Sequence, residues 1–177
     1  MNLDEKIINA LKDLDYKEAT EIQKKAIPIA LKKRDILAAA QSGTGKTAAF
    51  LLPILTELLA NKQVDKPILR ALILVPTREL ATQISKAVSD FSKYMEVESL
   101  AMVGGVSTKD QEKKIAKGLD ILVATSGRLM EHLKNGTVDL SSVTTVVIDE
   151  VDTMLDMGFL EDIEKILPSV GPKRQIM

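Results

Sequence analysis

The sequence predicts an α/β domain in which a mostly parallel β-sheet is covered by helices on both faces. From Asp35 onward, short apolar runs alternate with longer helical stretches, as expected of parallel strands joined by crossover helices. Several of these runs are apolar nearly throughout, which is typical of strands buried on both faces. A chain of 177 residues is long enough for one sizeable core, and nothing in the sequence indicates two.

The N-terminal residues 1–34 are expected to form two helices that belong to the same domain. The first helix is indicated by apolar residues at helical spacing: Leu3, Ile7, Ile8, Leu11 and Leu14. Thr20 and Gln23 have the spacing of a capping box and predict the start of a second helix. Pro28 is expected to interrupt or restart this second helix.

The core, residues 35–177, should contain five strands with helices between them. The expected strands are Ile36–Ala40, Ala71–Val75, Ser99–Val103, Ile121–Ala124 and Val143–Ile148. The expected helices are Lys46–Leu59, Arg78–Ser92, Thr108–Lys117, Arg128–Lys134 and one near Leu160–Leu167. Ala60–Pro67 should be a polar loop. In such sheets ligands bind at the carboxyl ends of the strands, so the residues just after each strand are the candidate site residues.

Composition excludes several classes of protein. The chain has no cysteine, which excludes a disulfide framework and metal sites with cysteine ligands. Its 24 Lys and Arg balance 25 Asp and Glu, so a polyanion would have to meet a local basic patch. The N-terminal residues mix charged with apolar side chains, unlike a signal peptide or a membrane span. We therefore expect a cytoplasmic protein that does not contact a membrane.

A glycine-rich loop follows the first expected strand. It consists of Ala40, Gln41, Ser42, Gly43, Thr44, Gly45, Lys46 and Thr47. This is Walker A spacing, with alanine in place of the first glycine and the strand, loop and helix context that the motif requires. Gly43 and Gly45 let backbone amides approach phosphate oxygens, while Lys46 can reach the β and γ phosphates. Thr47 supplies a hydroxyl for Mg²⁺. The alternative is an ordinary glycine-rich turn.

The last expected strand ends in the carboxylates Asp149, Glu150 and Asp152. A buried strand that delivers acidic side chains at its exit has the character of a Walker B motif. Asp149 would hold Mg²⁺ through a water, and Glu150 would orient and deprotonate the attacking water. Alternatively, these acids only stabilise the N-terminus of the next helical segment, which is most plausible for Asp152. Since their strands can lie side by side, Lys46 and Asp149 are expected to close one metal site.

The glycine-rich loop and the acidic tetrad resemble those of DEAD-box RNA helicases, and the resemblance covers essentially the whole chain. Residues 16–23 resemble the family's Q motif, so the resemblance implies that Gln23 recognises adenine and that Tyr16 belongs to the nucleotide site. Gln23 could instead serve only as the third helical residue of a capping box. The resemblance further implies a RecA-like P-loop NTPase domain that uses ATP and Mg²⁺, with Asp152 coupling it to a second RecA-like domain.

Three further segments resemble the family's RNA-binding motifs, and each follows an expected strand. The resemblance assigns contacts with the RNA backbone to Pro76, Thr77, Arg78, Gly104, Gly105, Thr125, Gly127 and Arg128. Hydroxyls, glycine amides and arginines suit phosphate and carry little sequence information. Taken singly, Thr77 could be only a helix N-cap and the Gly104-Gly105 doublet only a turn. His132 has no second imidazole or acid at metal-binding spacing and is predicted to be an ordinary surface or edge histidine.

The chain departs from the family pattern at several positions. The departing residues are Asp15, Ala19, Ser126 and Val151. The family's adenine-packing aromatic would fall before Met1, and the Ser-Ala-Thr motif after Met177. We therefore expect a monomeric ATP-binding portion of an ATP-dependent RNA helicase that is nearly inactive alone. The alternatives are a DNA helicase or another P-loop motor, and a non-catalytic RNA-binding scaffold that kept the fold.

Overall fold

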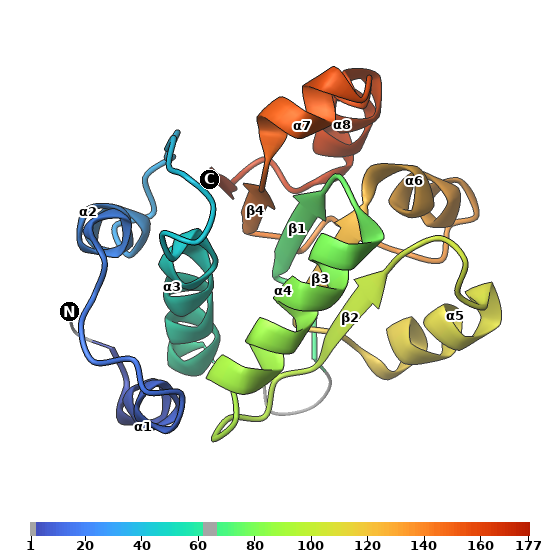
Figure 1. The fold of residues 1–177 in the computed structure, drawn as a ribbon. Coiled ribbons are helices and arrows are strands. Elements are labelled where there is room, and N and C mark those ends of the chain that lie inside the picture. Colours follow the sequence, from blue (N-terminus) through green and yellow to red (C-terminus); the bar gives the residue numbers. More distant parts are fainter. Residues whose placement is uncertain (1–2, 62–66) are drawn as a thin grey trace.

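The computed structural model describes residues 3–61 and 67–177, which form one sheet between two layers of helices (Figure 1). The sheet has five strands, all parallel, in the order β2-β3-β1-β4-β5. The strands are β1 (Ala71–Val75), β2 (Ser99–Met102), β3 (Ile121–Thr125), β4 (Thr145–Ile148) and β5 (Gln175–Ile176). The predicted α/β class with a parallel sheet is confirmed. In this arrangement the carboxyl ends of all strands lie along one edge.

Two sets of helices cover the two faces. One face carries α1 (Glu5–Asp13), α2 (Glu21–Ala30), α3 (Lys46–Ala60) and α4 (Arg78–Phe91). The other face carries α5 (Thr108–Lys117), α6 (Ser126–Lys134), α7 (Val151–Asp156) and α8 (Leu160–Ile166), the last followed by the 3-10 turn η1 (Leu167–Ser169). Within the described residues, no helix combines the length and apolar character needed to cross a bilayer.

The strand β1 is apolar throughout because alternate residues enter two different cores. In β1, Ile73 and Val75 pack with α3 and α4, whereas Leu72 and Leu74 pack toward α6 and α8. All of them are at most 1% exposed. Burying a Val, Leu or Ile side chain contributes roughly 1.5–3 kcal/mol, so this double burial fixes the sheet and thereby the positions of the loops at its carboxyl edge.

The predicted strand at residues 36–40 is wrong. The segment is extended but belongs to no strand, and the side chain of Leu37 is 96% exposed. It adjoins β5, where the backbone N–H of Ile36 donates to the carbonyl of Ile176 at 2.9 Å. Because β5 contains only Gln175 and Ile176, it offers few partners for a sixth strand. The glycine-rich loop is therefore positioned mainly by the helix that follows it.

Smaller differences concern the helices. Pro28 lies inside α2 and does not interrupt it, since the N–H of Leu31 still donates to the carbonyl of Ile27 at 3.0 Å. The proline sits in the last turn, where its missing N–H costs a single helical bond. The helix α7 and the strand β5 are not among the predicted elements. The predicted polar loop Ala60–Pro67 falls largely on residues 62–66, outside the described residues.

Candidate nucleotide and RNA site

The glycine-rich loop enters α3 through left-handed backbone. Gly43 has φ +79° and Gly45 has φ +92°, conformations that L side chains rarely adopt. A Cβ atom on Gly45 would also lie 2.4 Å from Nε2 of Gln23, so the position is closed to other residues on two grounds. The first amides of α3 have no helical acceptor, and the helix dipole favours an anion at this end. The loop therefore has the build of a phosphate cradle.

Two hydrogen bonds close this loop on itself. Nζ of Lys46 donates to the carbonyl oxygen of Ala40 at 2.9 Å, and Oγ1 of Thr44 donates to the carbonyl oxygen of Gln41 at 2.7 Å. An ammonium group bonded only to a carbonyl keeps two further donors. Lys46 can therefore contact phosphate oxygens with little movement of its own helix.

Gln23 ties α2 to the glycine-rich loop. Its side chain is only 3% exposed. Oε1 accepts the N–H of Thr20 at 3.0 Å, which completes the capping box, and Nε2 donates to the carbonyl oxygen of Gly45 at 3.1 Å. The predicted capping box is confirmed. The predicted role in recognising adenine stays a prediction, because both ends of the amide already have partners within the chain.

Asp149 leaves β4 beside Lys46, and the two side chains line one cavity. The other lining residues are Ile22, Ala26, Ile36, Ala38, Ala49, Phe50, Val147, Ile148 and Met177. Burial raises the pKa of the Asp149 carboxyl, and Lys46 and the N–H of Glu150, 3.1 Å away, act in the opposite direction. A partly buried carboxylate with a single cationic neighbour is suited to a divalent ion.

No group of three or more His, Asp or Glu side chains in residues 3–61 and 67–177 could hold a metal by itself. In nucleotide sites, Mg²⁺ keeps several waters and takes one or two carboxylates plus substrate phosphates. Asp149 could supply such a carboxylate, and Thr47 stands in the first turn of α3 with its side chain partly exposed.

Glu150 occupies a strained backbone position. Its φ of 53° and ψ of 47° place it in the left-handed region, where it serves as the N-cap residue of α7. A non-glycine residue in this region costs of order 1–3 kcal/mol, and such strain gathers at functional sites. Asp152 lies exposed in the first turn of α7, where its charge also stabilises the helix.

The three segments predicted to contact RNA meet at the same edge of the sheet. They line one open hollow together with a few neighbours, the lining residues being Pro76, Thr77, Arg78, Glu79, Gly104, Thr125, Ser126, Gly127, Arg128, Glu131 and Phe159. The segments come from the ends of β1, β2 and β3, which are adjacent in the sheet. The prediction that these segments stand at the ends of strands is confirmed.

Arg78 is the exposed arginine of this hollow. Nη1 of Arg78 lies 3.4 Å from the carbonyl oxygen of Gly104, and a Cβ on Gly105, whose φ is +79°, would come within 2.7 Å of the same nitrogen. Oγ1 of Thr77 accepts the N–H of Leu80 at 3.2 Å, so Thr77 is an N-cap, as its alternative interpretation held. Its hydroxyl proton is still available to a phosphate.

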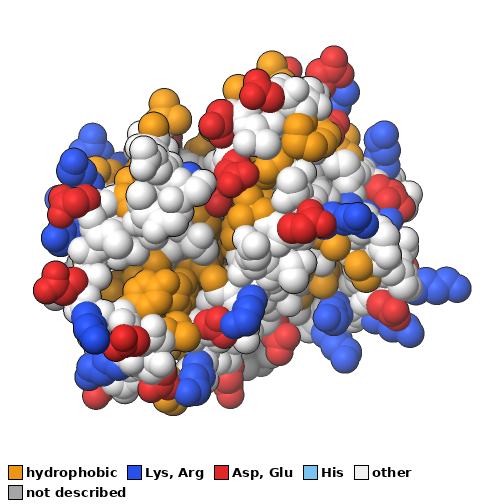
Figure 2. Space-filling view, in the orientation of Figure 1, with side chains coloured by type: hydrophobic (Ala, Val, Ile, Leu, Met, Phe, Trp, Pro, Cys, Tyr) orange, Lys and Arg blue, Asp and Glu red, His pale blue; other side chains and the backbone are white. Residues whose placement is uncertain are grey.

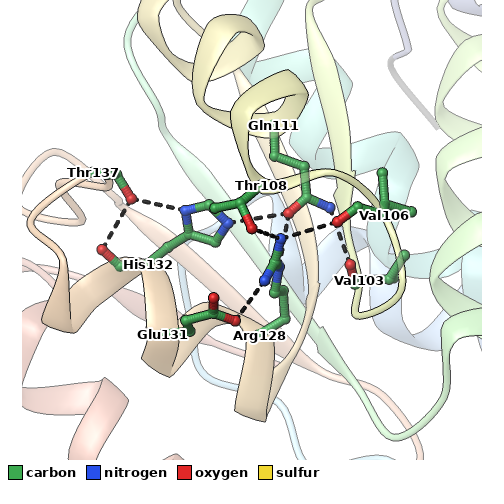
Figure 3. A network of polar contacts seen from close by, with 8 residues as sticks. All are labelled: Val103, Val106, Thr108, Gln111, Arg128, Glu131, His132 and Thr137. Atoms are coloured by element: carbon green, nitrogen blue, oxygen red, sulfur yellow. Dashed lines mark hydrogen bonds and ion pairs between the residues drawn. The ribbon is translucent and has the colours of Figure 1, made fainter.

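Arg128 and His132 belong to one network of polar contacts (Figure 3). The Arg128 side chain is 9% exposed and makes contacts from Nε, Nη1 and Nη2 to protein atoms. His132 is 0% exposed, so its prediction as a surface or edge histidine is wrong. Burial lowers the pKa of His132, and the nearby charge of Arg128 lowers it further. Both side chains meet the amide of Gln111, which no sequence motif identified.

Tyr16 lies away from the phosphate loop. Its ring meets Phe91 edge-on, with centroids 5.7 Å apart. Phe91 ends α4, and helices of a parallel sheet run back toward the amino ends of the strands, so this contact is at the edge opposite Gly45. Its nucleotide contact stays a prediction.

Ser126, where the family usually has proline, also has a partner that the sequence could not indicate. Its hydroxyl donates to Oδ2 of Asp162 on α8 at 3.1 Å, and Ser126 is 1% exposed. A hydrogen bond from a hydroxyl to a carboxylate stabilises by roughly 1.5–3 kcal/mol. It fixes the start of α6, and with it Thr125 and Gly127, against α8.

Comparison with known proteins decides the family. The model of the DEAD/DEAH box helicase matches residues 20–177. The chain belongs to this family. It is 43% identical over its whole length to a probable ATP-dependent RNA helicase ddx27 of Dictyostelium discoideum, covering 23% of that protein. It is 45% identical over 96% of its length to the ATP-dependent RNA helicase DeaD of Escherichia coli K12, covering 26% of it.

Solved structures agree with this assignment. A hypothetical ATP-dependent RNA helicase from Sulfolobus tokodaii superposes with a TM-score of 0.87 at 39% identity, over 99% of this chain and 49% of that one. The RecA-like α/β fold is thereby confirmed. The chain spans about a quarter of the length of the curated relatives that it matches.

Proposed function

We propose that this chain is the ATP-binding portion of an ATP-dependent RNA helicase, which couples binding and hydrolysis of ATP to RNA binding and local duplex unwinding. The observation that carries the proposal is the placement of two sites along one sheet edge. Lys46 and Asp149 line a cavity at the end of β4, and the hollow with Thr77 and Arg78 lies at the ends of the next strands. Relatives named as RNA helicases support this proposal.

The roles in the nucleotide site follow from the chemistry of its side chains. Amides around Gly43 and Gly45 hold phosphate oxygens, and Lys46 balances their charge. Thr47 and Asp149 would hold Mg²⁺ in this site. The ion, when bound, neutralises charge on the triphosphate. Glu150 orients the attacking water and takes its proton, for which its position beside Asp149 is suited.

The roles in the hollow concern the RNA backbone. Thr77 and Thr125 offer hydroxyls, Gly104 and Gly127 offer unobstructed amides, and Arg78 offers an exposed guanidinium. Such groups read phosphate and sugar, so binding should depend little on base sequence. On the face in Figure 2, acidic and basic side chains are interspersed without a large field of one sign, so the affinity must arise locally.

We further propose that the chain acts in the cytoplasm as a monomer, with a second RecA-like domain as its partner in the longer protein. Asp152 is our candidate for contact with that domain because it is exposed on α7, next to the acids of the nucleotide site. The cysteine-free composition supports a reducing compartment.

Two titrations of the 177-residue chain test the proposal. Calorimetry should show binding of ATP with Mg²⁺. Binding of GTP should be weaker, because the amide of Gln23 matches the donor and acceptor edge of adenine. Fluorescence anisotropy should show salt-dependent binding of single-stranded RNA, tighter than of DNA with the same sequence. Equal affinity for RNA and DNA would favour another P-loop motor, and RNA binding without any nucleotide binding would favour a scaffold.

A further inference from the structure

Four polar side chains, two buried and two half-buried, form a network behind the Gly104-Gly105 loop (Figure 3). Gln111 on α5 is 2% exposed, and Arg128 and His132 on α6 approach it from the neighbouring helix. Thr137, just after α6, completes the group. Buried polar groups are costly unless they are paired, so a network of this size in a small domain calls for a functional explanation.

Gln111 joins the network to the start of the loop. Its Nε2 donates to the carbonyl oxygen of Val103, the residue before Gly104, at 3.1 Å. Its Oε1 accepts from Nε of Arg128 at 2.9 Å and faces Nε2 of His132 at 3.1 Å. An amide oxygen can only accept, so this ring nitrogen of His132 carries the proton. Because two donors hold Oε1 of Gln111, the NH₂ group of the same amide points at the carbonyl oxygen of Val103.

Arg128 holds the other end of the loop. Its Nη2 donates to the carbonyl oxygen of Val106 at 3.1 Å and to Oγ1 of Thr108 at 2.7 Å. The turn that contains Gly104 and Gly105 is thereby tied at both ends by two side chains that are bonded to each other.

The charge of Arg128 is already balanced. Nη1 pairs with Oε2 of Glu131 at 2.5 Å, and the Arg128 side chain is only 9% exposed. Four contacts to Gln111, Glu131, Val106 and Thr108 engage all three of its nitrogens. A phosphate would have to compete with these partners. Arg78, which is exposed and has one long contact at 3.4 Å, is in the opposite situation.

We propose that Gln111 and Arg128 are positioning residues, which act on RNA through the Gly104-Gly105 loop and not by touching the phosphates. The proposal rests on the RNA-binding half of the proposed function. It assigns a role to Gln111, and it moves Arg128 from the phosphate-contacting set to the support behind the loop. His132 serves the same support by orienting the Gln111 amide.

Salt dependence of RNA binding separates contact from positioning. Each phosphate contact by a cation contributes about 0.7 to the slope of log affinity against log salt for a single strand. Arg128→Met and Gln111→Met should each weaken binding of an RNA oligonucleotide by roughly tenfold while leaving this slope unchanged. The variant that carries both substitutions should bind RNA about as well as either single variant, because both substitutions disrupt the same network. Arg78→Met should lower the slope by about 0.7.

Controls keep stability and function apart. Ile7→Val, in the core under α1, provides a variant with reduced stability that leaves the network intact, and its RNA affinity should equal that of the unmodified chain. Gln111→Glu keeps the acceptor for Arg128 but cannot donate to Val103. It should therefore recover part of the affinity lost in Gln111→Met.

A measurement without RNA tests the loop directly. Amide hydrogen exchange of Gly104, Gly105 and Val106, followed by NMR, should accelerate in Gln111→Met and Arg128→Met but not in Ile7→Val. Unchanged exchange in the network variants would overturn the proposal. A slope lowered by about 0.7 in Arg128→Met would show a direct phosphate contact and also overturn it. If the unmodified chain bound no RNA, the RNA-binding half of the proposed function would be wrong. The exchange data would still show whether Gln111 and Arg128 position the loop.

Discussion

The charge of Lys46 is expected to matter for ATP binding and not for the stability of the fold. Its ammonium contacts one loop carbonyl, that of Ala40, at 2.9 Å. Lys46→Ala should therefore abolish binding of ATP with Mg²⁺ while leaving the unfolding temperature within a few degrees of the unmodified chain. Calorimetric titration beside thermal unfolding checks both parts. Unchanged affinity in a folded variant would remove the loop from its proposed role.

At Asp149 function and stability should oppose each other. Burial raises the pKa of this carboxyl, so its contribution to stability is present at pH values below the unfolded pKa and is lost as pH rises through the folded pKa. At neutral pH the ionised form costs folding free energy. Asp149→Asn should thus raise the unfolding temperature of the nucleotide-free chain while weakening Mg²⁺-dependent ATP binding.

The matched control for Asp149 is Asp152→Asn, which removes an exposed acid of the same tetrad. It should change the unfolding temperature little, apart from the few tenths of a kcal/mol that an acid contributes at a helix N-terminus. Calorimetric scans at pH 7 of both variants make the comparison. A lower unfolding temperature for Asp149→Asn than for Asp152→Asn would show that burial does not dominate at Asp149.

At the scale of elements, the seating of α6 on α5 should depend on pH through His132. Its pKa is lowered by burial and by Arg128, against the opposing effects of Glu131 and Glu112. The stability that the neutral ring provides is present above the unfolded pKa of about 6.5 and is lost as pH falls through the lower folded pKa.

The free energy of unfolding should therefore fall between about pH 7.5 and pH 5.5. His132→Phe should be less stable at pH 7.5, because the amide of Gln111 loses a donor, but its stability should change less over this range. Urea unfolding at several pH values measures the difference. Parallel curves for the two chains would mean that His132 does not titrate in this window.

Elements whose pattern has one physical cause could be predicted from the sequence. The predicted strand Ala71–Val75 has the same bounds as β1, because its five consecutive apolar residues are buried on both faces. Residues 36–40 show the same apolar character but lack a long neighbouring strand, and strand pairing is not visible along the chain. Gln111 lies in a polar helix, and its burial depends on Arg128 and His132, which join it only in the folded chain.

At the scale of the whole molecule, the two sites share one edge of the sheet. Among the described residues, only one cationic side chain lines the nucleotide cavity. That cation is Lys46, whereas Arg78 and Arg128 line the RNA hollow. In phosphoryl transfer, an arginine that neutralises charge in the transition state is worth about 10³–10⁵ in rate. Coupling to RNA further requires two states of the protein in which each ligand makes different contacts.

The 177-residue chain alone should therefore release phosphate from ATP very slowly, with almost no stimulation by RNA and no unwinding of a short duplex. Steady-state phosphate release at saturating ATP, with and without single-stranded RNA, measures the first two, and Lys46→Ala provides the background rate. The relatives are about four times longer than the matched region. RNA-stimulated turnover near about one per second, typical of complete enzymes, would contradict this expectation. It would mean that Lys46, Asp149 and Glu150 suffice for catalysis, and that the hollow at the ends of β1, β2 and β3 transmits RNA binding to them within one domain.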